Sequence, residues 1–205
     1  MLTLHYNPLT VAPTIAIVLE ELGLDYTAVL VDFVTKAQAA PAHLALNPKG
    51  RVPVLVTDAG VLTETGAILY WLAAVHGPHL VPADAFQAAR MRETMYYLAA
   101  TLHVNFAHAL RGARWADRQA SWDDMTAKAP ETFAASLAYL EGHLDLAPFV
   151  VGDGYTLADP WLFVLTAFAS RLKIDVADYP KLAAHQAMMN DRASVQAARA
   201  KGVLA

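Results

Sequence analysis

The chain carries a proline directly in front of an apolar run that predicts a buried strand, in the stretch NPKGRVPVL at residues 47–55. Pro53 has no backbone N–H, and it pushes Val52 toward an extended conformation. Such a proline indicates an edge strand, a bulge or a tight turn, and tight turns can contain a cis X–Pro bond. If the chain turns here, the N–H and C=O of Val52 face outward and could pair with a bound peptide, as an added strand would. A plain turn before a strand is the alternative interpretation.

A second stretch, TETGAI at residues 63–68, has residue types that suit the charged end of an amino acid. Thr65 is a candidate N-cap, whose hydroxyl would accept a hydrogen bond from a free N–H of the following helix. The free N–H groups and the dipole of a helix start favour a carboxylate, and Glu64 beside them could hold an ammonium group. The alternative is an ordinary helix cap.

A third stretch, YTLADPWLF at residues 155–163, has the spacing of a capping box at Thr156 and Asp159, with Asp in place of the usual Glu. It precedes a very apolar run that predicts a buried helix. Asp159 is therefore expected to have an architectural role rather than a catalytic one.

Composition limits the classes of function. The 205 residues are 56% hydrophobic and 17% charged, which disfavours disorder, and the net charge of −4 argues against a dedicated nucleic-acid surface. The absence of cysteine excludes disulfides and any mechanism that uses an enzyme thiol. The histidines lack metal-ligand spacing, so no metal site is expected. The start MLTLHYNPLT does not resemble a signal peptide, and the apolar run at residues 161–170 is too short to span a bilayer, so a cytoplasmic protein is expected.

The order of elements predicts an α/β domain followed by an all-α domain. Strands and helices alternate in the first part, ending with a hairpin at residues 52–64 and a helix at 65–77. The second part shows only helical periodicity, in runs at residues 90–111, 131–144, 159–171 and 180–199. The predicted domains are therefore residues 1–77 and 87–205, joined by a linker at 78–86 that contains two prolines.

Together, NPKGRVPVL, TETGAILYWLA and VGDGYTLADPWLF resemble the cytosolic glutathione transferase family in their order and spacing, and the resemblance covers nearly the whole chain. It implies a thioredoxin-like domain followed by a helical bundle domain that forms the electrophile side of the site. It also implies a homodimer and a role in detoxification. Glutathione would be a co-substrate, with no other cofactor.

The resemblance also implies roles for individual residues of the first domain. Pro53 would be the family's cis-proline, and Val52 would offer its backbone to the cysteinyl part of glutathione. Glu64 and Thr65 match the pair that holds the γ-glutamyl end. Lys49 and Arg51 lie where the family often meets the glycyl carboxylate, although Lys49 could equally be a solvated loop lysine.

The family activates glutathione by stabilising its thiolate. A thiol with a pKa of about 8.5 needs roughly 2.7 kcal/mol of preference for the anion to lower that pKa by about two units, which one or two well-placed donors can supply. The donor usually follows the first strand, here in HYNPLTVAPT. Thr10 is the favoured candidate, with Tyr6, the amide of Val11 and Asn7 as alternatives.

In the second domain, TLHVNF at residues 101–106 resembles a bacterial beta-class segment in which a histidine faces the thiol, although Val104 stands where that class often has lysine. His103 is thus a candidate for the electrophile side, and Phe106, Arg111 and Trp115 could shape the same apolar pocket. The alternative is that these side chains belong to the helical core.

The expected function is a glutathione transferase that promotes attack of the thiolate on a small hydrophobic electrophile, or on a peroxide. The Ser-Ser-Cys stretch of the zeta-type isomerases is missing, which disfavours an isomerase. The alternative from another class is a non-catalytic protein that keeps this fold for partner binding. No nucleic acid or membrane is expected as a partner.

Overall fold

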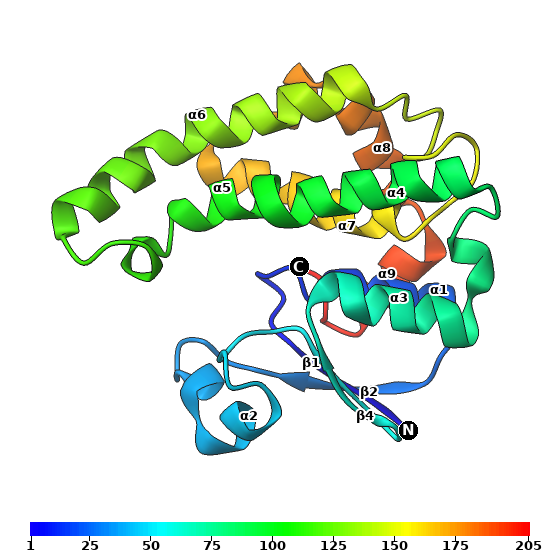
Figure 1. Cartoon of the computed structure of the whole chain (residues 1–205), viewed down its shortest axis with the longest axis horizontal. Coiled ribbons are helices and arrows are strands. Elements are labelled where there is room, and N and C mark those ends of the chain that lie inside the picture. Colours follow the sequence, from blue (N-terminus) through cyan, green and yellow to red (C-terminus); the bar gives the residue numbers. More distant parts are fainter. The chain divides into compact units, whose positions relative to one another are not determined.

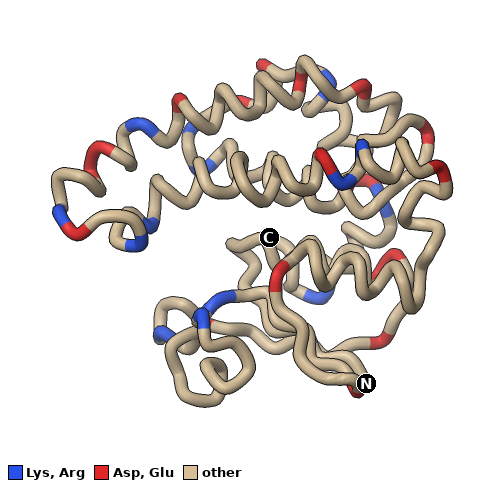
Figure 2. Tube along the Cα trace, in the orientation of Figure 1, with Lys and Arg blue, Asp and Glu red and all other residues tan.

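The computed structural model describes residues 1–205 and divides them into two compact units (Figure 1). The first contains Met1–Val81 together with Asn190–Ala205, and the second contains Pro82–Met189. The C-terminal segment thus belongs to the first unit, whereas the sequence placed it in the helical domain, because its contacts depend on a distant part of the chain. Acidic and basic residues are interspersed along both units (Figure 2).

The first unit is built on a four-stranded sheet with the strand order β2-β1-β3-β4. β1 pairs with β2 in parallel, while β1 with β3 and β3 with β4 are antiparallel. The parallel pair needs a crossover, which α1 supplies, and the predicted hairpin turns at Gly60. The strands are β1 (Leu2–Tyr6), β2 (Tyr26–Leu30), β3 (Val54–Thr57) and β4 (Gly60–Thr63).

Three helices of the first unit pack together along the sheet: α1 (Pro13–Glu21), α3 (Thr65–His76) and α9 (Ala193–Ala200) (Figure 1). Residues on every side of α1 are buried, which agrees with its nearly continuous apolar sequence. The short helix α2 (Pro41–Leu46) precedes the loop that carries Pro53. This thioredoxin-like arrangement, with a helical unit beside it in the chain, confirms the predicted fold class.

The second unit is helical. Its first helix begins at Ala85, earlier than the sequence indicated, because Asp84 caps it by accepting a hydrogen bond from Gln87 N at 2.9 Å. The helix predicted from residue 131 begins at Gln119 and continues through Pro130. The principal helices are α4 (Ala85–Tyr97), α5 (His103–His108), α6 (Gln119–His143), α7 (Ala158–Thr166) and α8 (Pro180–Asn190), and a π-helical segment, Leu98–Leu102, joins α4 to α5.

The C-terminal segment is attached to α1 by a polar cluster around Glu21. Arg192 Nε and Ser194 Oγ each donate to Glu21 Oε2 at 2.7 Å. Burial raises the pKa of Glu21, but these hydrogen bonds and the charge of Arg192 outweigh it and hold the pKa below its usual value. Ionised Glu21 therefore stabilises the docking of α9.

Asp159 organises the start of α7 as the capping-box spacing predicted. Its fully buried carboxylate accepts hydrogen bonds from Thr156 N at 2.7 Å, Thr156 Oγ1 at 2.9 Å and Val150 N at 2.8 Å. His185 Nε2 of α8 lies 3.2 Å from the same carboxylate. One side chain thus joins the loop before α7 to two helices, which confirms its architectural role.

Glu21→Gln should lower the melting temperature near neutral pH by roughly 2–4 °C, because about 1 kcal/mol of charge-assisted bonding is lost. Since the pKa of Glu21 is lowered on folding, its contribution is present above the ordinary pKa of about 4.3 and disappears as the pH falls through the lower folded value. Thermal melts across this range should show the two proteins converging in acid. A constant difference at every pH would contradict this account.

Asp159→Ala should lower the melting temperature much more, by roughly 6–12 °C, because removing this carboxylate leaves buried donors unpaired at a cost of about 3 kcal/mol or more. Asp153→Ala is the matched control, since Asp153 is exposed in the preceding loop. Differential scanning calorimetry would compare the two variants. Similar melting temperatures would mean that Asp159 has no architectural role.

Candidate functional site

The register of the sheet brings four chain segments to one edge of the first unit. His5 of β1 pairs with Val54 of β3, and Val54 pairs with Thr63 of β4. The end of β1, the start of β3, the end of β4 and the start of α3 therefore lie together. The predicted glutathione-site residues lie next to these segments, in the loop that precedes β3 and at the junction of β4 with α3.

The loop before β3 has the geometry expected of a peptide-binding edge. The Val52–Pro53 bond is cis, which confirms the prediction, and β3 begins at the next residue. Neither the N–H nor the C=O of Val52 takes part in a hydrogen bond within the protein. Both groups are therefore available to a ligand.

The turn leading into this edge depends on Asn47 and Gly50. Asn47 Oδ1 accepts from Lys49 N at 3.2 Å, and Asn47 O accepts from Gly50 N at 2.9 Å. Gly50 has a φ of 60°, and a Cβ there would lie 3.1 Å from the carbonyl oxygen of Gln38. The exposed side chain of Arg51 leaves this turn while its carbonyl oxygen is held inside the unit by His43 and Asn47.

At the start of α3, the predicted cap is displaced by one residue. Glu64 is the N-cap, and Thr65 is the first residue of the helix, so the prediction that Thr65 caps it was wrong. The cause is the backbone of Glu64, which leaves β4 with a φ of 70° and turns directly into the helix. Thr65 is buried, whereas the Glu64 carboxylate is exposed beside the free N–H groups of the helix start.

Lys49 lies next to Glu64 rather than in open solvent. Its ammonium group donates to Glu64 Oε1 at 2.6 Å and to Thr63 Oγ1 at 2.9 Å. The structure thus brings together Lys49 and Glu64, two residues predicted for opposite ends of glutathione. The glutamate already has a cationic neighbour of the kind that a ligand ammonium would provide.

The candidates for thiol activation lie just after β1, and their hydrogen bonds differ. Thr10 is only 8% exposed, and its hydroxyl donates to Asn7 O at 2.7 Å while accepting from Ala12 N at 3.2 Å. The buried Tyr6 hydroxyl donates to Gly202 O at 3.4 Å. The amide of Asn7 donates to Val31 O at 3.0 Å. Among these candidates, only the N–H of Val11 has no acceptor within the protein.

In the helical unit, His103 and Phe106 belong to an aromatic cluster that sequence analysis found only in part. The ring of Phe168 lies 4.5 Å from that of Phe106 and 6.3 Å from that of His103. Arg171 lies over the Phe106 ring at 4.8 Å, and burial lowers the pKa of Arg171. Phe168 and Arg171 follow α7, far from His103 in the chain, so no local pattern could have identified them.

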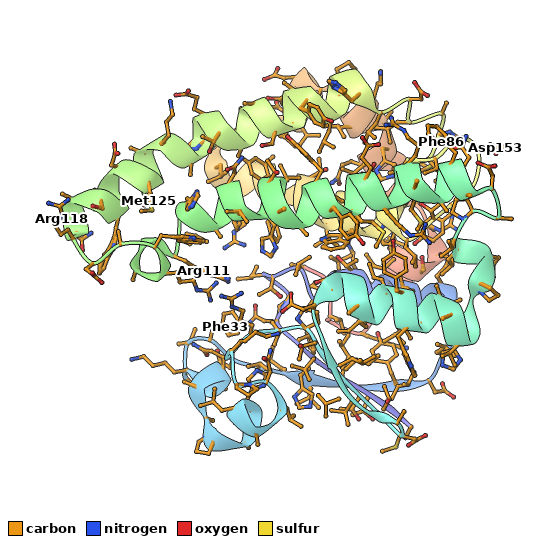
Figure 3. The ribbon with its side chains drawn as sticks, viewed as in Figure 1. Phe33, Phe86, Arg111, Arg118, Met125 and Asp153 are labelled. Atoms are coloured by element: carbon orange, nitrogen blue, oxygen red, sulfur yellow. The ribbon has the colours of Figure 1, made fainter.

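Arg111 and Trp115 lie in the connector between α5 and α6, where Figure 3 labels Arg111. Trp115 is 45% exposed and packs against His108, with ring centroids 4.5 Å apart. The ring of Trp115 thus contacts α5, whereas the Phe106 ring contacts Phe133 of α6 and Phe168.

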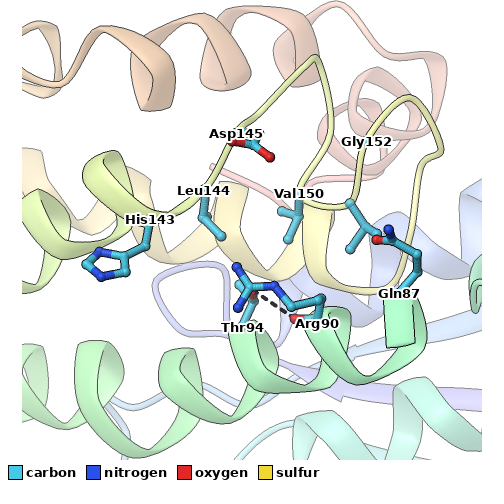
Figure 4. Close-up of a pocket in the computed structure, with 9 residues that line it drawn as sticks. Gln87, Arg90, Thr94, His143, Leu144, Asp145, Val150 and Gly152 are labelled. Atoms are coloured by element: carbon cyan, nitrogen blue, oxygen red, sulfur yellow. Dashed lines mark hydrogen bonds between the residues drawn. The ribbon is translucent and has the colours of Figure 1, made fainter. Parts of the chain in front are cut away.

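A small cavity of about 60 Å³ lies elsewhere in the helical unit (Figure 4). None of the predicted site residues lines it. Its wall is formed by Gln87, Arg90, Thr94, His143, Leu144, Asp145, Val150, Val151 and Gly152.

Two further observations concern the chain as a whole. No group of three or more potential acidic, histidine or cysteine ligands is close enough to hold a metal ion. None of the helices has both the length and the apolar character needed to cross a membrane.

Comparison with known proteins gives consistent results for both parts of the chain. Residues 2–74 match the family model for the glutathione S-transferase N-terminal domain, and residues 115–193 match the C-terminal domain. The chain is 29% identical over 201 residues to glutathione S-transferase GstA of Escherichia coli O157:H7, covering 94% of each protein. It is 34% identical over 176 residues to the maleylacetoacetate isomerase of Rhizobium meliloti, covering 83% of this chain and 82% of the relative.

Among solved structures, a glutathione transferase homologue from Sulfitobacter with bound glutathione superposes with a TM-score of 0.97 at 47% identity. The match covers 100% of this chain and 99% of the other. The two family domains match, the similarity to GstA extends over nearly its full length, and the fold agrees with a solved structure. This chain therefore belongs to the glutathione transferase family.

Proposed function

We propose that this protein is a glutathione transferase that binds the tripeptide along the Val52 edge and promotes attack of its thiolate on a small apolar electrophile. The observation that carries this proposal is the unpaired N–H and C=O of Val52 at the edge where β1, β3 and β4 meet. A bound peptide would complete both hydrogen bonds. Similarity to the Sulfitobacter protein, whose structure contains glutathione, supports the same assignment.

The γ-glutamyl end of glutathione would bind at the start of α3. Its carboxylate would meet the free N–H groups beside Thr65, and its ammonium would meet Glu64. Lys49 would then share or release the Glu64 carboxylate, to which it donates at 2.6 Å. Arg51, whose side chain is exposed on the same loop, would approach the glycyl carboxylate.

We infer that the thiolate is stabilised mainly by the N–H of Val11. The Thr10 hydroxyl has one proton, which it donates to Asn7 O at 2.7 Å, so it must give up that bond to donate to sulfur. The Val11 N–H needs no such change because it has no acceptor in the protein. The Thr10 side chain would contribute to the structure of the turn after β1. Tyr6 would have a structural role as well, since its hydroxyl donates to Gly202 O.

In the proposed reaction, the thiol of glutathione releases its proton to solvent, and the sulfur lone pair forms a bond to an electrophilic carbon while the leaving group departs with its electron pair. With a peroxide, sulfur would instead attack one oxygen and break the O–O bond, releasing an alcohol or water and leaving a sulfenic acid on glutathione. A second glutathione would then attack that sulfur, releasing water and forming the disulfide. The cluster of His103, Phe106 and Phe168 would contact an apolar electrophile, and Arg111 and Trp115 would act at the separate connector. Glutathione is the co-substrate, and no other cofactor is proposed.

A homodimer in the cytoplasm is proposed by analogy with the family. A purely partner-binding protein is not favoured, because Val52, Glu64 and the start of α3 retain the groups that a peptide requires. An isomerase is also not favoured, although one relative is a maleylacetoacetate isomerase, since the chain has no cysteine for the Ser-Ser-Cys stretch.

Reduced glutathione should raise the melting temperature. At a concentration about a hundredfold above the dissociation constant, ligand linkage stabilises the folded protein by about 2.7 kcal/mol, and the expected shift is roughly 5–10 °C. Thermal melts with and without the tripeptide would measure it. The absence of any shift would overturn the proposed function.

Glu64→Gln should reduce this shift by about half, because a neutral amide attracts the ligand ammonium about tenfold less strongly. Glu131→Gln is the matched control, since Glu131 also forms an exposed ion pair with a lysine, Lys128, on α6. An equal reduction in both variants would contradict a role for Glu64 in binding.

Thr10→Val should change the pKa of enzyme-bound glutathione by less than about one unit, or about 1.4 kcal/mol, if Val11 N–H is the main donor. Ultraviolet absorbance of the thiolate, titrated with the tripeptide bound, would measure this pKa. A return to the value of free glutathione would assign activation to the Thr10 hydroxyl instead.

A further inference from the structure

One carbonyl oxygen in the first unit is held by two side chains from the α2 region. Arg51 O accepts a hydrogen bond from Asn47 Nδ2 at 2.8 Å and lies 3.1 Å from His43 Nε2. His43 and Asn47 are 6% and 1% exposed, so both donor side chains are largely shielded from water. Because a carbonyl oxygen can only accept, the imidazole of His43 carries its hydrogen on Nε2.

This carbonyl shares a peptide group with the N–H that is proposed to bind glutathione. The Arg51–Val52 peptide is trans, so its C=O and N–H point in opposite directions within one plane. Holding the oxygen toward α2 therefore directs the Val52 N–H away from α2, where it has no acceptor in the protein. Two donors on the oxygen also polarise the peptide and make its N–H a stronger donor.

Packing alone does not account for an imidazole at this position. The second ring nitrogen of His43, Nδ1, is buried and has no hydrogen-bond partner. An unpaired buried acceptor is unfavourable, and an apolar side chain of similar size would avoid it. The feature that an imidazole has here and an apolar side chain would lack is the hydrogen bond from Nε2 to Arg51 O.

We infer that His43 is a positioning residue for glutathione, which orients and polarises the Val52 N–H through the Arg51–Val52 peptide without touching the ligand. The inference rests on the proposed function. The Asn47 side chain shares this role but also accepts a hydrogen bond from Lys49 N in the following turn, whereas the side chain of His43 has no other hydrogen bond. Substituting the His43 side chain therefore tests the hydrogen bond to the Arg51–Val52 peptide group without removing any other hydrogen bond.

The test compares His43→Phe with His5→Phe in the full chain. Phe keeps a ring in the buried position but removes the donor. His5 is the matched control because its ring lies 6.0 Å from that of His43, yet it makes no hydrogen bond to Arg51.

In His43→Phe, the dissociation constant for reduced glutathione, measured by calorimetry, should rise about three- to tenfold, as expected for one hydrogen bond. The value of kcat with a halonitrobenzene at saturating glutathione should stay within about twofold, since the reacting atoms are untouched. The Val52 amide proton in ligand-free protein should move upfield in the NMR spectrum, because its peptide is less polarised. His5→Phe should leave all three readouts near the wild-type values.

A second pair keeps the inference testable if His43→Phe does not fold. The amide of His43→Gln can donate to the same carbonyl, so this variant should bind within about twofold of wild type, whereas His43→Met, of similar length, should bind about three- to tenfold more weakly. Equal affinities for Gln and Met, or an unchanged affinity in folded His43→Phe, would overturn the role of His43 alone. If the wild type does not bind glutathione, the proposed function itself fails.

Discussion

The proposed site depends on one backbone constraint: the sheet pairs the chain from Val54 onward but leaves Val52, two residues earlier, unpaired. Polar backbone groups that water does not reach need partners, and a sheet normally supplies them. Here the ladder starts at Val54, after a proline that cannot donate. The N–H and C=O of Val52 are thus an incomplete strand position, and its geometry is set by the registers of β1, β3 and β4 before any ligand arrives.

At the charged end of the site, the backbone of Glu64 adopts an energetically unfavourable conformation. Glu64 adopts a φ of 70°, a conformation that costs a non-glycine residue about 1–3 kcal/mol. Its exposed ion pair with Lys49 contributes only about 0–1 kcal/mol, too little to offset this. The fold therefore tolerates strain at Glu64, and its effect is to place a carboxylate beside the start of α3. This placement suits a ligand with an ammonium and a carboxylate on one carbon.

Sequence patterns predicted the features whose causes are local. The Thr156–Asp159 box and the turn at Gly60 follow from residues a few positions apart, and the cis Val52–Pro53 bond followed from the family motif. The failures involve distant contacts. The docking of α9 depends on Glu21, and the place of Arg171 beside Phe106 depends on how α5 packs against the segment that follows α7. No periodicity encodes such pairs, so the aromatic cluster was only partly found.

The group that stabilises a thiolate cannot be identified from the side-chain types after β1 alone. A hydroxyl after β1 suggests a donor, but a threonine in a turn also bonds to nearby backbone, as Thr10 does with Asn7 O. The backbone N–H of the next residue is present whatever its side chain, and the turn decides whether it is free. At Val11 it is free. A chain without the family's tyrosine, serine or cysteine pattern can therefore retain a thiolate donor, provided that the turn keeps its shape, and the backbone bond from Thr10 N to Asn7 O at 3.2 Å holds that turn independently of the side chain.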